Sequence, residues 1–218
     1  MAKSPTALVA GATGLTGKHL LEILLADQRY ASVHALVRNA SLRSHPRLTE
    51  HVVDFESLPK MPKADDAFCC LGTTIRKAGS QAAFRKVDFD YVLNFARAAK
   101  VAGVRRFWVV SALGANPKSA VFYNRVKGEI ENALKAMEFD SLYIFRPSFL
   151  LGERAEARAG ERLGIAVFSV LAPQLIGPAS RVRPVDAKAV ARAMVLAASG
   201  SANGTRVIES DEIAVPIA

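Results

Sequence analysis

A glycine-rich loop, GATGLTG at residues 11–17, constrains the fold of this sequence more than any other feature. A short apolar run at 6–10 enters the loop, and a segment with helical periodicity at 16–26 leaves it. Glycine is needed where the chain turns sharply, where the backbone approaches a pyrophosphate and where helix and strand pack closely. The helix N-terminus then offers free N–H groups to phosphates. We expect a dinucleotide-phosphate site with contacts from Gly11, Thr13, Gly14, Leu15, Thr16 and Gly17.

Short β-rich apolar runs alternate along the chain with longer segments of helical period. This alternation predicts βαβ units with right-handed crossovers, hence an α/β, Rossmann-like, doubly wound and mostly parallel sheet with helices on both faces. The predicted strands are 6–10, 33–37, 51–54, 66–71, 107–111, 142–146 and 206–209. The predicted helices are 16–26, 81–102, 121–137 and 186–199.

The alternation breaks between residues 147 and 184, which hold four of the ten prolines and an irregular apolar stretch. We interpret this part as a small cap over the carboxyl edge of the sheet. With 218 residues, half of them hydrophobic, the chain is predicted to form one domain, 1–218, with the cap inside it.

The net charge of +9 comes from 29 Lys and Arg residues against 20 Asp and Glu residues. The basic residues are single or paired, and no aromatic residues interleave with them as in nucleic-acid-binding motifs. A solvated basic surface is therefore favoured over a nucleic-acid site. An anionic small molecule would use only a few of these charges.

The two cysteines, Cys69 and Cys70, are adjacent and cannot form an ordinary disulfide framework, which favours a reducing compartment. No apolar run has membrane-spanning length, and the one that ends at Gly11 is too short for a signal peptide. The four histidines show no metal-ligand spacing. The sequence predicts a cytoplasmic protein without membrane association or a bound metal.

The end of the second predicted strand decides which dinucleotide is preferred. An NAD site usually places a carboxylate there to bind the ribose hydroxyls. This chain has Arg38 instead, which can pair with a 2′-phosphate. The alternative is an ordinary surface arginine at a strand end. The arginine and the missing carboxylate together predict NADP(H) over NAD(H).

Two further segments are candidates for cofactor contact. Asp54, after the third predicted strand, either receives the adenine amino group or is a turn carboxylate. The fourth predicted strand leads into Leu71, Gly72, Thr73 and Thr74, which is either a strand-ending turn or a backbone path close to the cofactor. Its expected position at the switch point beside the first strand favours cofactor contact.

A catalytic set is predicted around the fifth strand and the helix that follows it. The strand ends at Ser111, and Tyr123 and Lys127 are four residues apart on that helix, so they share a face. Tyrosine has an ordinary pKa of about 10, and a nearby cation favours the phenolate. Tyr123 would exchange a proton with a carbonyl or alcohol, Ser111 would hold the substrate oxygen, and Lys127 would also anchor the cofactor ribose.

Together these motifs resemble the short-chain dehydrogenase/reductase superfamily, in particular atypical members related to the Tat-interacting-protein oxidoreductases. GATGLTG is shared widely, whereas CLGTT at 70–74, KAGS at 77–80 and VDFDYV at 87–92 are more specific. The resemblance implies a seven-stranded Rossmann sheet, NADP(H) binding and catalysis by Ser111, Tyr123 and Lys127. It also implies that Arg146, Pro147 and Ser148 shape the nicotinamide side of the pocket.

The chain departs from this family pattern at Asp88. Many relatives carry an asparagine there that helps to organise a proton relay, whereas an ionised aspartate accepts hydrogen bonds but cannot donate them. Two functions remain open. One is an NADP(H)-dependent oxidoreductase acting on a small carbonyl or alcohol. The other is an NADP(H)-binding redox-sensing or regulatory protein with little turnover and a protein partner.

Overall fold

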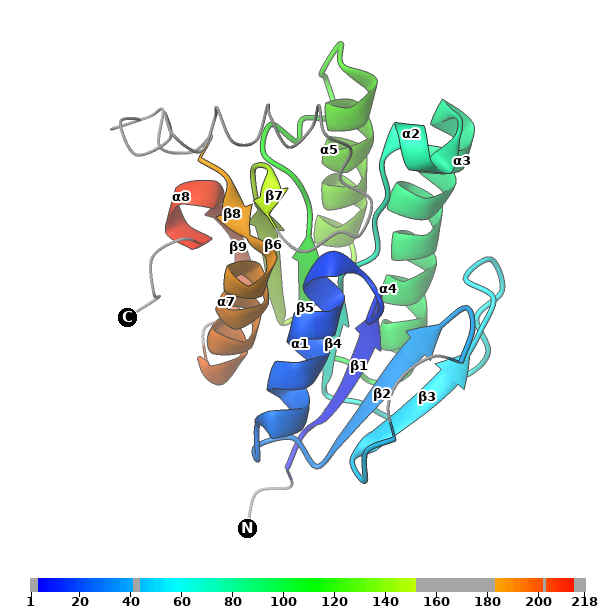
Figure 1. Ribbon diagram of the computed structural model, residues 1–218, viewed down its shortest axis with the longest axis vertical. Coiled ribbons are helices and arrows are strands. Elements are labelled where there is room, and N and C mark those ends of the chain that lie inside the picture. Colours follow the sequence, from blue (N-terminus) through cyan, green and yellow to red (C-terminus); the bar gives the residue numbers. More distant parts are fainter. Residues whose placement is uncertain (1–3, 41–43, 152–182, 202, 214–218) are drawn as a thin grey trace.

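One fully parallel sheet of seven strands organises the molecule (Figure 1). The computed structural model describes residues 4–40, 44–151, 183–201 and 203–213. The strand order is β3-β2-β1-β4-β5-β6-β9, with the change of direction beside β1, as in Rossmann folds. The predicted doubly wound, seven-stranded architecture is confirmed. The strands are β1 Thr6–Ala10, β2 Ser32–Val37, β3 Leu48–Val52, β4 Asp66–Cys69, β5 Arg106–Val110, β6 Ser141–Arg146 and β9 Gly204–Glu209.

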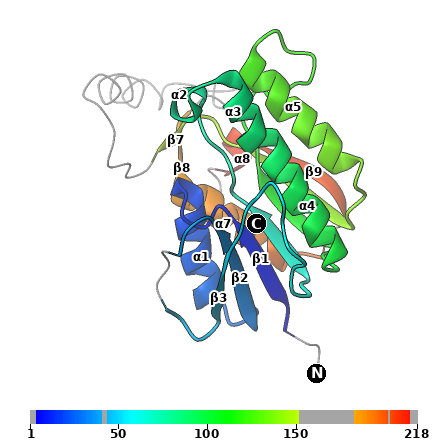
Figure 2. The same cartoon turned by 90° about the vertical axis from the view of Figure 1, so that its right-hand side faces the viewer.

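Helices cover both faces of the sheet, as the view turned by 90° shows (Figure 2). Helices α1 (Leu15–Ala26) and α7 (Ala187–Ser199) pack together on one face. Helices α4 (Tyr91–Val101) and α5 (Phe122–Lys135) cover the other. Four shorter segments complete the helical structure: α2 Ile75–Ala78, α3 Gln81–Arg85, the π-helical turn η1 Lys86–Asp90 and α8 Ser210–Ile213.

The core has two apolar layers because successive residues of a strand point to opposite faces. Val9 and Trp108 belong to the layer under α1 and α7, whereas Leu8 and Phe107 belong to the layer under α4 and α5. All four are at most 1% exposed. Strands buried on both faces read as continuous apolar runs, which is why β1, β4, β5 and β6 were visible in the sequence.

Most predicted bounds differ from the structure by one or two residues, and two elements differ more. The helix predicted at 81–102 consists of α3, η1 and α4 in succession, so a π turn interrupts its middle. The third strand, predicted at 51–54, is Leu48–Val52. It is the edge strand and partly faces solvent, so the polar residues Thr49 and Glu50 follow its first residue and obscure its start.

Most of the predicted cap, residues 152–182, lies outside the described residues. The described residues on either side form a second, two-stranded parallel ladder of β7 (Leu150–Leu151) and β8 (Val185–Asp186). Asp186 also caps α7, since its Oδ1 accepts the N–H of Lys188 at 2.7 Å. Strands of two residues carry no periodicity, so the ladder was not predicted. The single-domain organisation over 1–218 stays a prediction.

Within the described ranges, no helix combines the length and the apolar character needed to cross a bilayer.

Candidate active site

The glycine loop lies between β1 and α1, and two of its glycines are required by the packing of the chain itself. Gly11 has φ +83°, and a Cβ there would lie 2.5 Å from the carbonyl carbon of Cys70. A Cβ on Gly17 would lie 1.9 Å from the carbonyl oxygen of Gly11. The loop therefore sits directly on the end of β4 and on the first turn of α1. No larger residue fits either position without moving backbone.

The same loop fits a dinucleotide phosphate. Helix α1 begins after Gly14, which has no side chain to cap the free N–H groups of the first turn. The hydroxyl of Thr16 is buried and has no hydrogen-bond partner among the described residues. Uncapped donors, a buried free hydroxyl and the positive end of the helix dipole suit an anion.

Replacing Gly14 by alanine is expected to weaken dinucleotide binding without unfolding the chain. Gly14 has an extended backbone (φ −78°), and an added Cβ would lie 3.2 Å from the Gly11 carbonyl oxygen, a tight but tolerable contact. The methyl group would stand where the backbone must approach the pyrophosphate, so we expect a loss of affinity of about tenfold or more. Calorimetric titration with NADPH measures it. Gly200→Ala, whose Cβ would be in ordinary contact, is the control, and equal affinity of both variants would contradict the prediction.

The residues predicted to read the adenosine half lie at the same edge of the sheet. Arg38 is exposed directly after the end of β2. Asp54 holds a turn, since its Oδ1 accepts the N–H of Glu56 at 2.9 Å and its carbonyl accepts the N–H of Ser57. The turn interpretation of Asp54 is thus observed, and its contact with adenine stays a prediction.

The segment after β4 approaches Lys127, one of the residues predicted to be catalytic. Thr74 caps α2 by accepting the N–H of Lys77 at 3.1 Å. The N–H of Thr73 donates to Asp88 Oδ2 at 2.8 Å. A Cβ on Gly72 would lie 3.4 Å from Asp88 Oδ1 and 3.9 Å from the Lys127 Nζ. The predicted cofactor-side backbone therefore passes over the side chains of Asp88 and Lys127.

Lys127 is a buried cation held by Asp88. Its Nζ lies 2.7 Å from Asp88 Oδ1, and the side chains are 6% and 0% exposed. Burial opposes the charge, but the carboxylate of Asp88 and the nearby Tyr123 outweigh it and raise the pKa of Lys127 above its usual value. Tyr123 lies one turn earlier on α5, half-buried, with its ring against Phe84 at a centroid distance of 5.3 Å. The structure thus brings Lys127 to Gly72, with Tyr123 one turn earlier on the same helix.

The hydroxyl of Ser111 is directed at Glu131 instead. Ser111 follows β5, and its Oγ donates to Glu131 Oε1 at 2.6 Å, with both residues buried. A carboxylate only accepts, so the single hydroxyl hydrogen of Ser111 is in use. Ser111 can therefore only accept a hydrogen bond from a substrate. Its predicted role of holding the substrate oxygen is thus restricted to an oxygen that carries a hydrogen.

Arg146, at the end of β6, holds the far side of Glu131. Its Nε and Nη2 lie 3.0 and 2.6 Å from the two carboxylate oxygens, and its Nη1 lies 3.0 Å from Glu209 Oε1. Such a two-point pair fixes the carboxylate in position. The guanidinium predicted to shape the nicotinamide side is thus occupied by two acidic partners.

The next two residues anchor the chain. Pro147 is buried, and its carbonyl accepts the N–H of Leu113 at 2.9 Å. The N–H of Ser148 donates to Ser210 Oγ at 3.1 Å, and its hydroxyl donates to the carbonyl of Arg183. Contact of Pro147 and Ser148 with a cofactor stays a prediction.

Two important positions on α5 were missed by the sequence analysis. Glu131 is four residues after Lys127 and eight after Tyr123, so the helical period alone indicated that it shares their face. Gly128 is the second, because a Cβ there would lie 2.2 Å from the Pro117 nitrogen. A glycine inside a predicted helix is the signal for such a close approach.

The two cysteines are not reactive groups of this site. Burial raises the pKa of the Cys69 thiol to about 12 and raises that of Cys70 as well. Because the thiolate is the reactive form, both side chains behave as small apolar groups.

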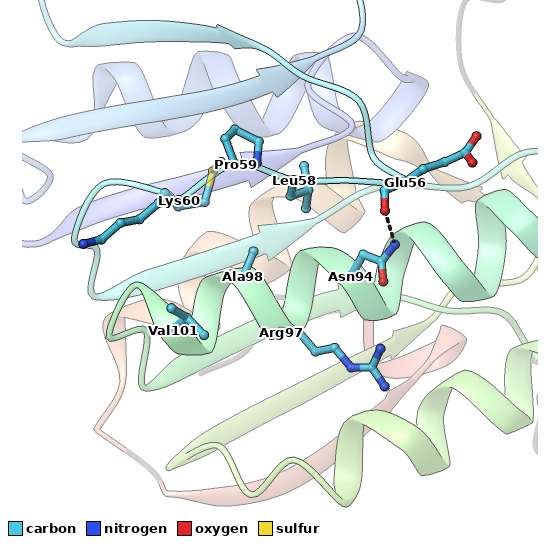
Figure 3. A pocket seen from close by; sticks show the side chains of 9 residues that line it. Glu56, Leu58, Pro59, Lys60, Asn94, Arg97, Ala98 and Val101 are labelled. Carbon is cyan, nitrogen blue, oxygen red and sulfur yellow. Dashed lines mark hydrogen bonds between the residues drawn. The ribbon is translucent and has the colours of Figure 1, made fainter.

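A separate surface pocket lies between the segment that follows β3 and helix α4 (Figure 3). Its volume is about 480 Å³, and one wall is fixed where Asn94 donates to the carbonyls of Phe55 and Glu56 at 3.0 and 3.4 Å. None of the residues predicted for the cofactor or the substrate lines it. Its lining is Glu56, Leu58, Pro59, Lys60, Met61, Asn94, Arg97, Ala98 and Val101.

Comparison with known families agrees with this arrangement. A family model described as NAD(P)H-binding matches residues 11–162, from the glycine loop past the end of β7. The chain belongs to this NAD(P)H-binding family.

Relatives of this NAD(P)H-binding protein are similar over most of its length. Protein HTATIP2 of Rattus norvegicus is 39% identical over 176 residues, 78% of this chain and 72% of that protein. Protein FMP52, mitochondrial, of Eremothecium gossypii is 38% identical over 212 residues, 95% of each chain. The predicted resemblance to atypical short-chain dehydrogenases/reductases near the Tat-interacting-protein group is confirmed.

Solved structures share the fold at low sequence identity. MoeE5 in complex with UDP-glucuronic acid and NAD has a TM-score of 0.72 at 21% identity, over 93% of this chain and 75% of that one. UDP-N-acetylglucosamine 4-epimerase from Methanobrevibacter ruminantium M1 has a TM-score of 0.68 at 17% identity, over 95% and 77%. The shared architecture is a Rossmann-like fold.

Proposed function

We propose that this protein is an NADP(H)-dependent oxidoreductase that acts on a small carbonyl or alcohol. The observation that carries the proposal is the buried Lys127, one turn after Tyr123 and beneath the Gly72 backbone. A phenol and a cation at the same sheet edge as the glycine loop support this proposal. Membership of the NAD(P)H-binding family supports the use of that edge for a dinucleotide.

Each group has a distinct task in this proposal. The bound nicotinamide supplies or accepts the hydride. The loop glycines and the N-terminus of α1 hold the pyrophosphate. Lys127 provides a fixed positive charge near the ribose side of the site, and Tyr123 gives or takes the proton at the substrate oxygen. Because the Ser111 hydrogen is bonded to Glu131, Tyr123 is the proton donor of this set.

The decisive experiment presents NADPH deuterated at C4 with a panel of aldehydes and ketones. Transfer of deuterium to a carbonyl carbon, detected by mass spectrometry, supports the proposal. No transfer with any compound, together with clear NADPH binding, supports the second candidate, an NADP(H)-binding regulatory protein. The bond between Ser111 and Glu131 favours that candidate, since it removes one hydroxyl donor from the site. Its test is whether NADPH and NADP⁺ change the affinity of co-purifying protein partners differently.

The preference for NADP(H) over NAD(H) is part of the proposal and rests on Arg38. We expect Arg38→Ala to weaken NADPH binding by about tenfold or more, because a charge-assisted contact to phosphate contributes about 1.5–3 kcal/mol. NADH binding should be unchanged. Thermal shifts with both cofactors measure the effect, and Arg192→Ala, an exposed arginine on α7, is the control. Equal loss for NADPH and NADH would contradict the role of Arg38.

The predicted cytoplasmic location remains part of the proposal. The fungal relatives carry "mitochondrial" in their names, so a mitochondrial location is the alternative. Fractionation of cells that express the tagged full chain distinguishes the two.

A further inference from the structure

The Ser111 hydroxyl is fixed in one orientation by a chain of buried contacts. Ser111 and Glu131 are 6% and 2% exposed, and the hydroxyl donates to Glu131 Oε1 at 2.6 Å. Arg146 donates to both oxygens of this carboxylate at 3.0 and 2.6 Å, and Glu209 holds the other end of the guanidinium at 3.0 Å. The carboxylate therefore cannot turn away from Ser111 without breaking its contacts with Arg146.

The bond from Ser111 to Glu131 is stronger than the bond that a plain substrate carbonyl offers. A hydrogen bond to an ionised group is roughly twice as strong as one between neutral groups. To donate to a carbonyl oxygen, Ser111 would have to exchange its charge-assisted bond for a neutral one and leave the buried carboxylate with one donor fewer. The hydrogen of Ser111 therefore stays with Glu131 when a substrate binds.

The oxygen of Ser111 remains available as an acceptor. No group among the described residues donates a hydrogen bond to it. Its lone pairs can take a hydrogen from a ligand, but they repel the lone pairs of a carbonyl oxygen, which carries no hydrogen. At this point the site therefore selects a ligand group that can donate.

Ser111 begins a segment that runs along the part of α5 that carries Tyr123. The N–H of Asn116 donates to the carbonyl of Asn124 at 2.9 Å, and a Cβ on Gly114 would lie 3.2 Å from the Asn124 Nδ2. Asn124 directly follows Tyr123 in the sequence. A substrate that reaches Tyr123 thus also lies beside the segment that begins with Ser111.

We propose that Glu131 is a positioning residue that keeps Ser111 as a hydrogen-bond acceptor, and that the substrate is a carbonyl compound with a hydroxyl group on the neighbouring carbon. The inference rests on the proposed function, in which Tyr123 gives the proton at the carbonyl oxygen. The neighbouring hydroxyl donates to Ser111 and is unchanged by the reaction. The carbonyl carbon takes the hydride of NADPH, its oxygen takes the proton of Tyr123, and the product is a vicinal diol.

The test compares three small ketones with NADPH as the reductant. Hydroxyacetone carries the required hydroxyl, butanone has a methyl group of similar size in its place, and methoxyacetone keeps the electron-withdrawing oxygen without a hydrogen on it. We expect kcat/KM for hydroxyacetone to exceed that for each of the others by about tenfold, the scale of one hydrogen bond. A value for either of them within about twofold of that for hydroxyacetone overturns the proposal.

Two variants show whether Ser111 and Glu131 cause this preference. Ser111→Ala removes the acceptor. Glu131→Met removes the carboxylate with little change in volume and frees the Ser111 hydrogen for an oxygen without one. In both variants hydroxyacetone should keep no more than about a twofold advantage over methoxyacetone. Ser199→Ala, whose hydroxyl bonds within α7 at 3.1 Å, is the control and should keep the tenfold ratio. An unchanged ratio in Ser111→Ala or Glu131→Met overturns the proposal.

The measured quantity is a ratio of two rates on one preparation. Glu131→Met leaves Arg146 with Glu209 alone, and a smaller folded fraction lowers the rates with both ketones equally. A merely structural role of Glu131 would therefore not move the ratio. Ser111→Ala leaves both contacts of Glu131 with Arg146 in place, so it tests the proposal even if Glu131→Met does not fold.

Failure of the proposed function gives a different result. If no carbonyl takes deuterium from NADPH, the oxidoreductase function is refuted, and the affinities of the unreacted ketones for the NADPH-loaded chain are compared by NMR saturation transfer. Tighter binding of hydroxyacetone than of methoxyacetone, lost in Ser111→Ala, retains the acceptor role of Ser111, whereas equal binding refutes that role as well. A chain that reduces all three ketones equally keeps the oxidoreductase function and refutes the inference.

Discussion

Tyr123→Phe is expected to lower the rate of carbonyl reduction by about 10²- to 10⁴-fold, the usual contribution of a positioned general acid. The substitution removes one oxygen and keeps the ring, which packs against Phe84. NADPH affinity should therefore stay within about twofold, since the loop and Arg38 are untouched. Steady-state kinetics with any carbonyl that accepts deuterium, together with calorimetric titration of NADPH, measures both quantities.

Tyr91→Phe is the matched control for this prediction. Tyr91 begins α4, and its hydroxyl donates to Glu56 Oε1 at 3.3 Å. Its loss should leave turnover unchanged. If Tyr123→Phe retains full turnover, the assignment of Tyr123 as proton donor is wrong, whatever its effect on cofactor binding.

Glu131→Ala is expected to cost about 3–5 kcal/mol of unfolding free energy, because it leaves the half-buried guanidinium of Arg146 without its main partner. Glu131 is 2% exposed, accepts the Ser111 hydroxyl at 2.6 Å and pairs at two points with Arg146. Glu209 stays within 3.0 Å of Arg146 and limits the loss to the lower end of this range. Urea unfolding monitored by circular dichroism measures the change.

Glu129→Ala provides the comparison on the same helix. Glu129 pairs with Arg85, but the two side chains are 31% and 41% exposed, so its loss should cost no more than about 1 kcal/mol. Similar destabilisation by the two variants would show that the buried cluster around Glu131 contributes nothing beyond an exposed ion pair.

The fold was predictable from the sequence because its signals are local. The run at 6–10, the glycines at 11–17 and the strand at 142–146 each occupy a few consecutive residues whose pattern reflects burial on both sheet faces. The edge strand β3 is less apolar, and its bounds were placed three residues late at its start. The ends of a helix or strand are hardest to predict where only one side of the element packs against the core.

The residues of the candidate site could be predicted from the sequence, but their hydrogen bonds and ion pairs could not. The spacing of Tyr123 and Lys127 gives their common helix face, whatever the rest of the chain does. The pair of Lys127 with Asp88 depends on a π turn, and the orientation of the Ser111 hydroxyl depends on Glu131 and Arg146. These partners come from elements far apart in the sequence, so no local sequence pattern predicts the contacts between them.

The short ladder of β7 and β8 has a consequence for how two distant parts of the chain are held together. Leu150 pairs with Val185 and Leu151 with Asp186, so the chain leaves the described fold and returns to it at neighbouring points. Backbone pairing in this ladder thus holds Leu150–Leu151 and Val185–Asp186 beside each other independently of the seven-stranded sheet that positions the glycine loop.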